Sequence, residues 1–330
     1  MKNYKEVVGI DVSKKTIDAY CHQAHTHKEF KNEISGYKSL LKWVLKQTKG
    51  IDVFYCFENT GYYSLKLALY FNKEKIVYVE ESPLKIKRSS GVVKEKTDRL
   101  DACLIARYGW IYREELKPSS VKSTSQLELG RLLALRDQIV RNNAGLKGTL
   151  KELKVLLTSA TTDACCISLK RSIDYLTKQI KSIELRIQEL ILDDDLMQKN
   201  YELLTSLKGV GFVVACQLIY HTGNFTRFDT WRSFSSYCGT APFAHESGTS
   251  IKRRKQCHYL GDRKMKSLLS MASVSAIQHD SELRIYYKRK LAEGKDKMLA
   301  INNVRNKLIS RAFAVVKRGT PYVVLQNYAA

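Results

Sequence analysis

The first 120 residues alternate short apolar runs with segments of helical periodicity, and this succession restricts the fold more than any other feature of the chain. Three runs of strand type come first, a helical segment follows, and a strand, a helix, a strand and a helix complete the order. This order predicts a mixed sheet with helices packed on it. The expected strands cover residues 7–12, 16–20, 28–34, 51–57 and 75–79, and the expected helices cover 36–48, 62–71 and a stretch that begins near Thr97.

Serine-rich sequences at 118–120 and 123–125 indicate a hinge after this α/β region. Beyond the hinge, Ile and Leu residues between Ile173 and Leu190 recur at alternating spacings of three and four, which is the pattern of a coiled coil. An earlier helix, over about 125–157, has a similar apolar seam that Asn142 and Asn143 interrupt. We therefore predict an α-helical coiled-coil hairpin, which either packs on itself or joins two subunits.

The final third is expected to be mainly helical, with few strand signals. Its best helical segments cover residues 203–219, 230–238, 262–278 and 297–317. The whole chain is thus expected to form three domains: an α/β domain over 1–120, a coiled-coil helical hairpin over 121–198 and a mainly α domain over 199–330.

Basic residues exceed acidic ones by a wide margin. The 330 residues include 56 Lys and Arg against 33 Asp and Glu, a formal net charge of +23, and residues 199–330 alone hold 22 basic and 8 acidic residues. Such a charge favours a polyanionic partner, and we expect nucleic acid ahead of an anionic membrane. Since no apolar run is long enough to span a membrane, and neither a signal peptide nor a disulfide framework is apparent, we expect a cytoplasmic protein.

Four carboxylates stand beside the expected elements of the first region. Asp11 is near the end of the first strand, Glu58 follows the strand over 51–57, and Asp98 and Asp101 share one face of a helix start because they are three residues apart. In an RNase H-like sheet the first strand lies beside the later parallel strand, so these side chains can converge. Four oxygen donors suit Mg²⁺, with Mn²⁺ as a substitute, and a two-metal site suits phosphodiester cleavage. Each acid alone is equally explained as a strand end, a loop residue or a helix cap.

Three segments of the chain resemble the signatures of the DEDD insertion-sequence transposases, the insertion-sequence family numbered one hundred and ten, which is related to the Piv-type DNA invertases. They are Val-Gly-Ile-Asp-Val-Ser-Lys at 8–14, Glu-Asn-Thr-Gly-Tyr-Tyr at 58–63 and Lys-Thr-Asp-Arg-Leu-Asp-Ala at 96–102. The resemblance implies an RNase H-like (RuvC-like) N-terminal nuclease domain, a coiled-coil insert and a C-terminal transposase domain. It places an acidic tetrad on Asp11, Glu58, Asp98 and Asp101. It also implies donor and target DNA, a noncoding bridge (guide) RNA and a homodimer or homotetramer as partners.

The sequence Leu-Lys-Gly-Val-Gly at 207–211 is typical of a helix-hairpin-helix. Its glycines, Gly209 and Gly211, permit a tight turn, so that Lys208 and the backbone N–H groups of the second helix can meet a DNA phosphate. The alternative is a glycine corner that only packs two helices together.

A later block, Gly-Thr-Ala-Pro at 239–242 followed by Ser247-Gly248, resembles the C-terminal part of the same transposases. The resemblance implies that Ser247, in a loop, is the nucleophile. From the residues alone, Ser250 is a rival, and a serine in a loop is more often simply solvated. The basic residues that follow can neutralise a scissile phosphate; they are Lys252, Arg253, Arg254 and Lys255.

These features predict a transposase, a DNA recombinase that cuts and rejoins strands through a phosphoserine intermediate under the guidance of a bridge RNA, at the nucleoid of a prokaryotic cell. One alternative is a RuvC-like Holliday-junction endonuclease that uses metal-activated water and no serine. An actin-like ATPase or sugar kinase would need further glycine-rich loops, and none is apparent in residues 180–330. A catalytically silent nucleic-acid-binding protein would not need all four acids.

Overall fold

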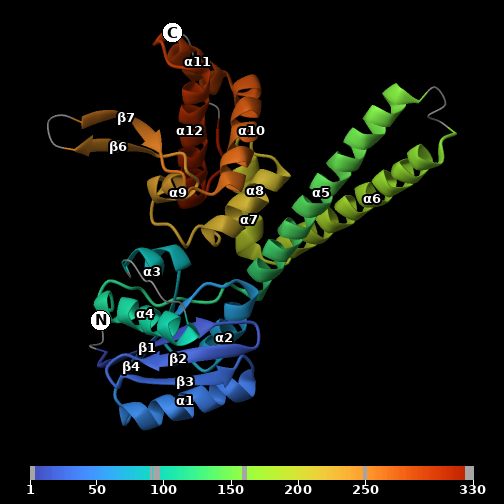
Figure 1. The fold of residues 1–330 in the computed structure, drawn as a ribbon. Helices are drawn as coiled ribbons and strands as arrows, with labels where there is room; N and C mark the ends of the chain where they lie inside the picture. Colours follow the sequence, from blue (N-terminus) through green and yellow to red (C-terminus); the bar gives the residue numbers. More distant parts are fainter. Residues whose placement is uncertain (1–3, 90, 92–96, 158–161, 248–250, 324–330) are drawn as a thin grey trace. The chain divides into compact units, whose positions relative to one another are not determined.

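A computed structural model describes residues 4–89, 91, 97–157, 162–247 and 251–323 of the chain. It divides into two compact units, Met1–Val121 and Lys122–Ala330 (Figure 1). Among the described residues, no helix is both long and apolar enough to cross a lipid bilayer.

The N-terminal unit is a five-stranded mixed sheet with the strand order β3-β2-β1-β4-β5. Strand β1 pairs antiparallel with β2 and parallel with β4, and β4 pairs parallel with β5. The predicted strands and helices are present, with boundaries shifted by a few residues, but a short helix over 83–89, with Ile86 as its buried residue, was not predicted. The elements are β1 (Glu6–Val12), β2 (Thr16–Cys21), β3 (Thr26–Lys31), α1 (Ile34–Thr48), β4 (Val53–Glu58), α2 (Tyr62–Lys73), β5 (Tyr78–Glu81), α3 (Pro83–Ser89) and α4 (Asp98–Ile111).

Helices cover both faces of this sheet, and alternate residues of β1 supply both cores because successive side chains of a strand point to opposite faces (Figure 1). Ile10 belongs to an apolar cluster with Tyr37 of α1 and Phe71 of α2. Val7 belongs to a second cluster with Ile105 of α4. Strand β1 is thus buried on both sides, as a central strand that reads as a continuous apolar run should be.

Gly9 allows β1 and α4 to approach each other closely. A Cβ atom at this position would lie 2.4 Å from the carbonyl oxygen of Ala102 and 2.2 Å from the backbone nitrogen of Ala106. Since no side chain fits there, only glycine lets the first turns of α4 lie against the end of β1. This contact places the start of α4 beside Asp11.

The second unit contains a long helical hairpin and a mainly helical part that ends the chain. Its elements are α5 (Thr124–Leu156), α6 (Ala164–Leu192), α7 (Asp195–Thr205), α8 (Phe212–Thr222), α9 (Trp231–Tyr237), β6 (Pro242–Ser247), β7 (Ile251–Cys257), α10 (Arg263–His279), α11 (Ser281–Ala292) and α12 (Lys297–Arg318). One large apolar cluster joins the base of the hairpin to α7–α12.

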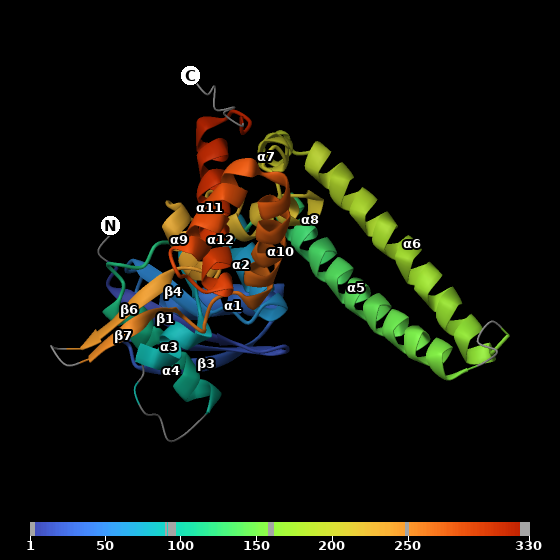
Figure 2. The ribbon, with the colours of Figure 1, turned by 90° about the horizontal axis from the view of Figure 1, so that it is seen from above.

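Helices α5 and α6 lie along each other over their length (Figures 1 and 2). Ion pairs cross between them, such as that of Arg136 with Glu184 at 2.7 Å. Asn143, which interrupts the apolar seam, is buried and donates a hydrogen bond to Thr177 of the other helix at 3.1 Å. A buried polar pair of this kind fixes the register of two helices, since slippage would leave it without its partner.

The structure differs from two of the sequence predictions for the last third. The segment 203–219 is not one helix, because the chain turns between the end of α7 at Thr205 and the start of α8 at Phe212. Strands β6 and β7 form an antiparallel hairpin where few strand signals were expected. Ser247 is consequently the last residue of a strand and not a loop residue, with Ile251 as its register partner. Ser250 lies outside the described residues.

Candidate active site and nucleic-acid contacts

Three of the four predicted acids come together in the N-terminal unit. Asp11 is the penultimate residue of β1, and Asp98 and Asp101 occupy the first turn of α4, whose start is capped by the Thr97 hydroxyl. One carboxylate oxygen from each of Asp11, Asp98 and Asp101 lies within 4.8 Å of the other two. We call these three residues the aspartate cluster.

The aspartate cluster is built in a way that suits a divalent cation. Burial, together with the charges of Asp101, Glu58 and Asp98, raises the pKa of Asp11 to about 6. Convergent carboxylates that repel one another in the free protein offer hard oxygen ligands and negative charge to Mg²⁺ or Mn²⁺. The donor set therefore fits a divalent metal, as the resemblance of the sequence motifs implies.

Glu58 lies close to this cluster but is not one of the three acids whose oxygens meet. Ile10 of β1 and Phe57 of β4 are register partners, so Asp11 and Glu58 each follow that pair by one residue on adjacent parallel strands. This explains why the charge of Glu58 acts on Asp11. The sheet thus places Glu58 beside the aspartate cluster, as the spacing of strands in the sequence predicts.

Other polar residues near the cluster were not predicted. Asp18 is the register partner of Asp11 on β2, is buried, and is 2.8 Å from the Nε2 atom of His27. Glu81 is the register partner of Glu58 on β5 and accepts hydrogen bonds from Tyr108 and from Lys85. The sequence analysis missed both carboxylates because their position near the cluster depends on which strands are neighbours in the sheet. The apolar pattern of one strand does not show which strand it pairs with.

The chain turns at two glycines between α7 and α8. Gly209 has a φ of 91° and packs against α10, where a Cβ atom would lie 2.4 Å from the carbonyl oxygen of Ala272. Gly211 is the N-cap of α8, and among the described residues no side chain caps that helix. Lys208 and Gly211 are exposed. The first N–H groups of α8 and the Lys208 ammonium are therefore placed where a phosphate can approach.

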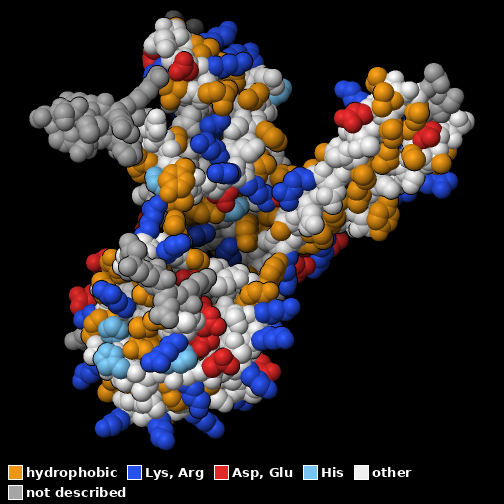
Figure 3. All heavy atoms as spheres, in the orientation of Figure 1, with side chains coloured by type: hydrophobic (Ala, Val, Ile, Leu, Met, Phe, Trp, Pro, Cys, Tyr) orange, Lys and Arg blue, Asp and Glu red, His pale blue; other side chains and the backbone are white. Residues whose placement is uncertain are grey.

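Strand β7 carries the four basic residues that follow the candidate nucleophile. Lys252, Arg253, Arg254 and Lys255 lie within this strand, and the backbone of Arg253 is opposite that of His245 on β6. In the described part of the same unit, Lys and Arg side chains are spread over the surface of the C-terminal helices (Figure 3). The hairpin is thus a basic extension from a basic unit.

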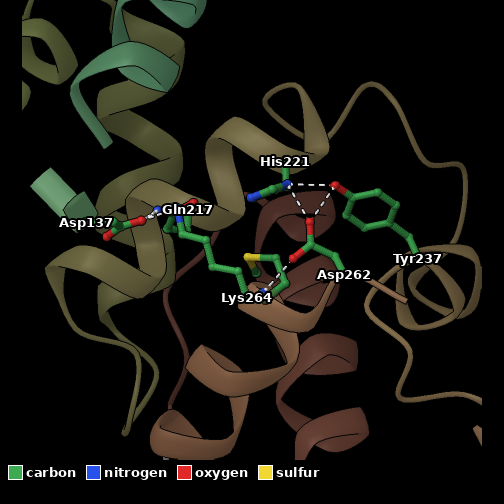
Figure 4. A network of polar contacts seen from close by, with 7 residues as sticks. Asp137, Gln217, His221, Tyr237, Asp262 and Lys264 are labelled. Atoms are coloured by element: carbon green, nitrogen blue, oxygen red, sulfur yellow. Dashed lines mark hydrogen bonds and ion pairs between the residues drawn. The ribbon is translucent and has the colours of Figure 1, made fainter. Parts of the chain in front are cut away.

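A polar network joins α8 to the two chain segments that flank this hairpin, at the end of α9 and at the start of α10 (Figure 4). The hydroxyl of Tyr237 donates to Asp262 at 3.1 Å and lies 2.9 Å from the Nδ1 atom of His221. Asp262 also caps α10 through the backbone N–H of Met265.

His221 is the histidine of this network, and its side chain is 12% exposed. Burial, together with nearby cations that include Lys264, lowers its pKa to about 4 against the opposing attraction of Asp262. A neutral His221 can donate from Nδ1 to the Tyr237 hydroxyl, which in turn donates to Asp262. Each polar group of the network then has a hydrogen-bond partner. The same surroundings raise the pKa of Tyr237, so this hydroxyl stays protonated.

The sequence matches two protein-family models in regions that correspond to these sites. Residues 8–159 match a transposase model of the DEDD IS110 type, and residues 201–288 match the transposase IS116/IS110/IS902 family. The pilin gene-inverting proteins of Moraxella bovis and Moraxella lacunata are each 26% identical to this chain, over 96% of its length and 98% of theirs. An uncharacterized 43.6 kDa protein of insertion element IS110 from Streptomyces coelicolor is 31% identical over 50% of this chain and 39% of that protein.

Proposed function

Because the chain belongs to the IS110 family of transposases and is therefore a DNA recombinase, we propose that it uses an acidic metal site together with Ser247 to cut and rejoin strands. The observation that carries the proposal is the aspartate cluster, whose three oxygens lie within 4.8 Å of one another. The related pilin gene-inverting proteins, whose name describes the inversion of a DNA segment, support the same class of reaction.

The residues proposed to hold the cation are Asp11, Asp98 and Asp101, with Glu58 beside them. A bound Mg²⁺ or Mn²⁺ supplies positive charge next to the phosphate that is cut. The first turn of α4 carries two of the ligands, so the helix start orients them. Negative charge at a helix N-terminus is favourable, which helps to hold the acids ionised when the cation is present.

Ser247 is proposed to be the nucleophile. Its Oγ atom would attack the scissile phosphorus, an Oγ–P bond would form, and the bond from phosphorus to the leaving sugar oxygen would break. The serine hydroxyl gives up its proton as the Oγ–P bond forms, and the leaving sugar oxygen takes up one proton, so the step is balanced. The strand is held as a phosphoserine until another hydroxyl displaces the serine and returns a proton to its Oγ atom. The basic residues 252–255 on β7 support this role, because they can neutralise the phosphate during attack.

DNA phosphates are proposed to be held by Lys208 and by the N–H groups at the turn of Gly209 and Gly211. These contacts read the backbone and not the sequence. Target choice would then come from a bridge RNA that pairs with donor and target DNA, and the net charge of +23 suits a chain that binds both polymers. A homodimer or homotetramer, at the nucleoid of the cell, completes this proposal.

Trapping of a covalent DNA adduct tests the role of Ser247. On a nicked DNA substrate that prevents religation, wild-type protein with Mg²⁺ should accumulate a protein–DNA species that protease removes. Ser247→Ala should bind the DNA and form no such species, whereas Ser250→Ala should form it like the wild type. A covalent adduct in Ser247→Ala would move the nucleophile to another residue.

The second candidate function is a RuvC-like Holliday-junction endonuclease that uses metal-activated water. One observation favours it, namely that the aspartate cluster is assembled within the N-terminal unit alone. Metal-dependent cleavage of a four-way junction at the wild-type rate by Ser247→Ala, with no covalent species in either protein, would support this alternative.

A further inference from the structure

A pocket of about 220 Å³ lies at the base of the β6–β7 hairpin. Its walls come from the end of α9, the start of β6 and the segment between β7 and α10. The lining residues are Ser236, Tyr237, Phe243, His258, Leu260 and Gly261. The proposed function uses none of them.

Aromatic side chains that are exposed to solvent form much of this pocket. Phe243 is 42% exposed, and its ring meets that of His258 edge to face, with centroids 6.4 Å apart. His258 in turn stacks on Tyr259, with centroids 4.7 Å apart and ring planes 25° from parallel. Tyr259 and Leu260 are 70% and 43% exposed. A contiguous group of exposed rings around a hollow is typical of a binding site, because such a surface is costly to leave in water.

The pocket is fixed in shape by the framework behind it. Tyr237 is held by His221 and Asp262, so its ring stays in place as a wall (Figure 4). The backbones of Gly239 and Gly261 are in direct contact, since a Cβ atom on Gly261 would lie 2.2 Å from the Cα of Gly239.

The start of β6 is anchored as well. The carbonyl oxygen of Thr240 accepts hydrogen bonds from the side-chain amides of Asn302 and Asn306 on α12, at 2.9 and 3.0 Å. A pocket that is formed before its ligand arrives loses little freedom on binding.

Basic residues lie close to the pocket-lining residues along the chain, and one basic side chain lies against the pocket wall. Strand β7 brings residues 252–255, all basic, to within a few positions of His258. The guanidinium of Arg227 lies 5.2 Å from the centre of the Tyr237 ring. Basic groups interleaved with exposed rings are the pattern by which proteins hold unpaired nucleic acid strands, because phosphates meet the cations and bases stack on the rings.

We propose that this pocket receives one unpaired nucleobase of a DNA or RNA strand whose phosphates are held by β7. The flat face of the base stacks on the ring of Phe243, and the ring of His258, which is nearly perpendicular to it, meets the edge of the base. The Nδ1 atom of His258 accepts the N–H of Leu260 at 3.3 Å, which leaves Nε2–H, with the Ser236 hydroxyl, to meet the polar edge of the base. This inference rests on the proposed function, since it assumes that the hairpin lies against a nucleic acid strand. An apolar side chain of a partner protein is the other occupant, but the cations beside the pocket favour the strand.

The inference is tested by binding of duplexes that differ at a single position. Fluorescence anisotropy would compare three DNA duplexes of one sequence: one with an unpaired adenine, one with an abasic site in its place, and one fully paired. Three RNA duplexes of the same sequence and design show whether the pocket takes its base from DNA or from RNA. Wild-type protein should bind the unpaired adenine about fivefold or more tightly than the abasic site, in DNA, RNA or both. Phe243→Ala should bind the two with equal affinity, and Phe243→Tyr should restore the preference.

Control variants separate this outcome from a general loss of binding. Tyr175→Ala removes a ring that is 63% exposed on α6 and should keep the preference of the wild type. Should Phe243→Ala fail to fold, as judged by circular dichroism, His258→Ala carries the same prediction. Equal wild-type affinity for the adenine and abasic duplexes, with both still bound, would overturn the pocket and leave the proposed function standing. Absence of binding to every duplex would overturn both.

Discussion

Asp11 is placed where a carboxylate is unfavourable unless a cation accompanies it. Burial and three acidic neighbours raise its pKa to about 6, so the ionised form is destabilised in the folded protein relative to the unfolded chain. At neutral pH Asp11 is ionised in both states, and the folded state alone carries this cost. The cost disappears as the pH falls from about 6 to the ordinary value of 3.8.

Replacement of Asp11 by asparagine should therefore stabilise the metal-free protein while it removes metal binding. At pH 7 we expect Asp11→Asn to raise the free energy of unfolding of the N-terminal unit by roughly 1 kcal/mol, after allowance for solvent screening of a partly exposed group. Urea unfolding measures the stability, and titration calorimetry with Mn²⁺ measures the binding. Asp52→Asn, at an exposed position of the same unit, should change neither quantity. A less stable Asp11→Asn variant that still binds Mn²⁺ would contradict this account of the cluster.

His221 gives the C-terminal unit the opposite dependence on pH. Its pKa in the folded protein is about 4, below the ordinary 6.5, because burial disfavours the charged ring. Above pH 6.5 the ring is neutral in both states. As the pH falls from 6.5 to 4, the unfolded chain takes up a proton that the folded protein does not, so stability is lost.

We expect this loss of unfolding free energy to reach about 2 kcal/mol at pH 4, compared with a variant that has no imidazole at position 221. His221→Gln keeps a polar group near Tyr237 and cannot take up the proton. The difference in unfolding free energy between wild type and His221→Gln, measured by urea unfolding at steps from pH 7 to pH 4, should shift in favour of the variant. A constant difference over this range would show that the ring titrates alike in the folded and unfolded protein.

At the scale of the element, the two glycines of the turn between α7 and α8 have different roles. Gly209 is required by the backbone, and Gly211 leaves room for a ligand. Gly209 has a φ of 91° and lies against the backbone of α10, whereas a Cβ atom on Gly211 would have nothing within 4 Å. We expect Gly209→Ala to lower the melting temperature strongly, with a cost of about 2 kcal/mol or more. Gly211→Ala should cost less than about 1 kcal/mol. Thermal unfolding followed by circular dichroism compares the two, and equal losses would mean that the turn relaxes around Gly209.

The sequence predicts the elements of the N-terminal unit well because its strands are buried on one or both faces. Strand β1 reads as an apolar run, and α1 has its buried residues at helical spacing. The strand β7 was missed for a physical reason: four of its seven residues are basic, so no apolar alternation marks it. Helix α11 was missed because Leu283 is its one buried side chain among the described residues. The single helix expected over 203–219 was wrong because its apolar spacing continues across the turn at Gly209, although the glycines themselves indicated a turn there.

The same reasoning explains which site residues the sequence indicated. The acids Asp11, Asp98 and Asp101 stand at the ends of strongly patterned elements, so their convergence followed once the order of the elements was known. The aromatic pocket at the hairpin base could not be predicted, because Phe243 and His258 are distant in sequence and meet only through a hairpin without a strand signal. Ser247 rests on family resemblance alone.

At the scale of the whole molecule, each compact unit contains its own hydrophobic core. The apolar clusters that include Ile10 and Val7 draw their residues from the N-terminal unit. The clusters that include Leu204 and Leu150 draw theirs from the second unit. With 121 and 209 residues, both units are long enough to fold independently.

Separate cores lead us to expect two transitions in differential scanning calorimetry, of which Mg²⁺ should shift only one. Metal that binds the folded aspartate cluster stabilises the N-terminal unit by about 2.7 kcal/mol when its concentration is 100 times the dissociation constant. For a unit of this size that corresponds to a rise on the order of 10 °C in its melting temperature. The melting temperature of the second unit should stay unchanged with Mg²⁺ and rise when duplex DNA is added, because the phosphate contacts proposed at Lys208 and along β7 belong to that unit.

In Asp11→Asn the shift in melting temperature caused by Mg²⁺ should vanish, while the shift caused by DNA remains. One cooperative transition that Mg²⁺ moves as a whole would mean that the two units unfold together, and that stability gained at the metal site is shared with the DNA-binding unit.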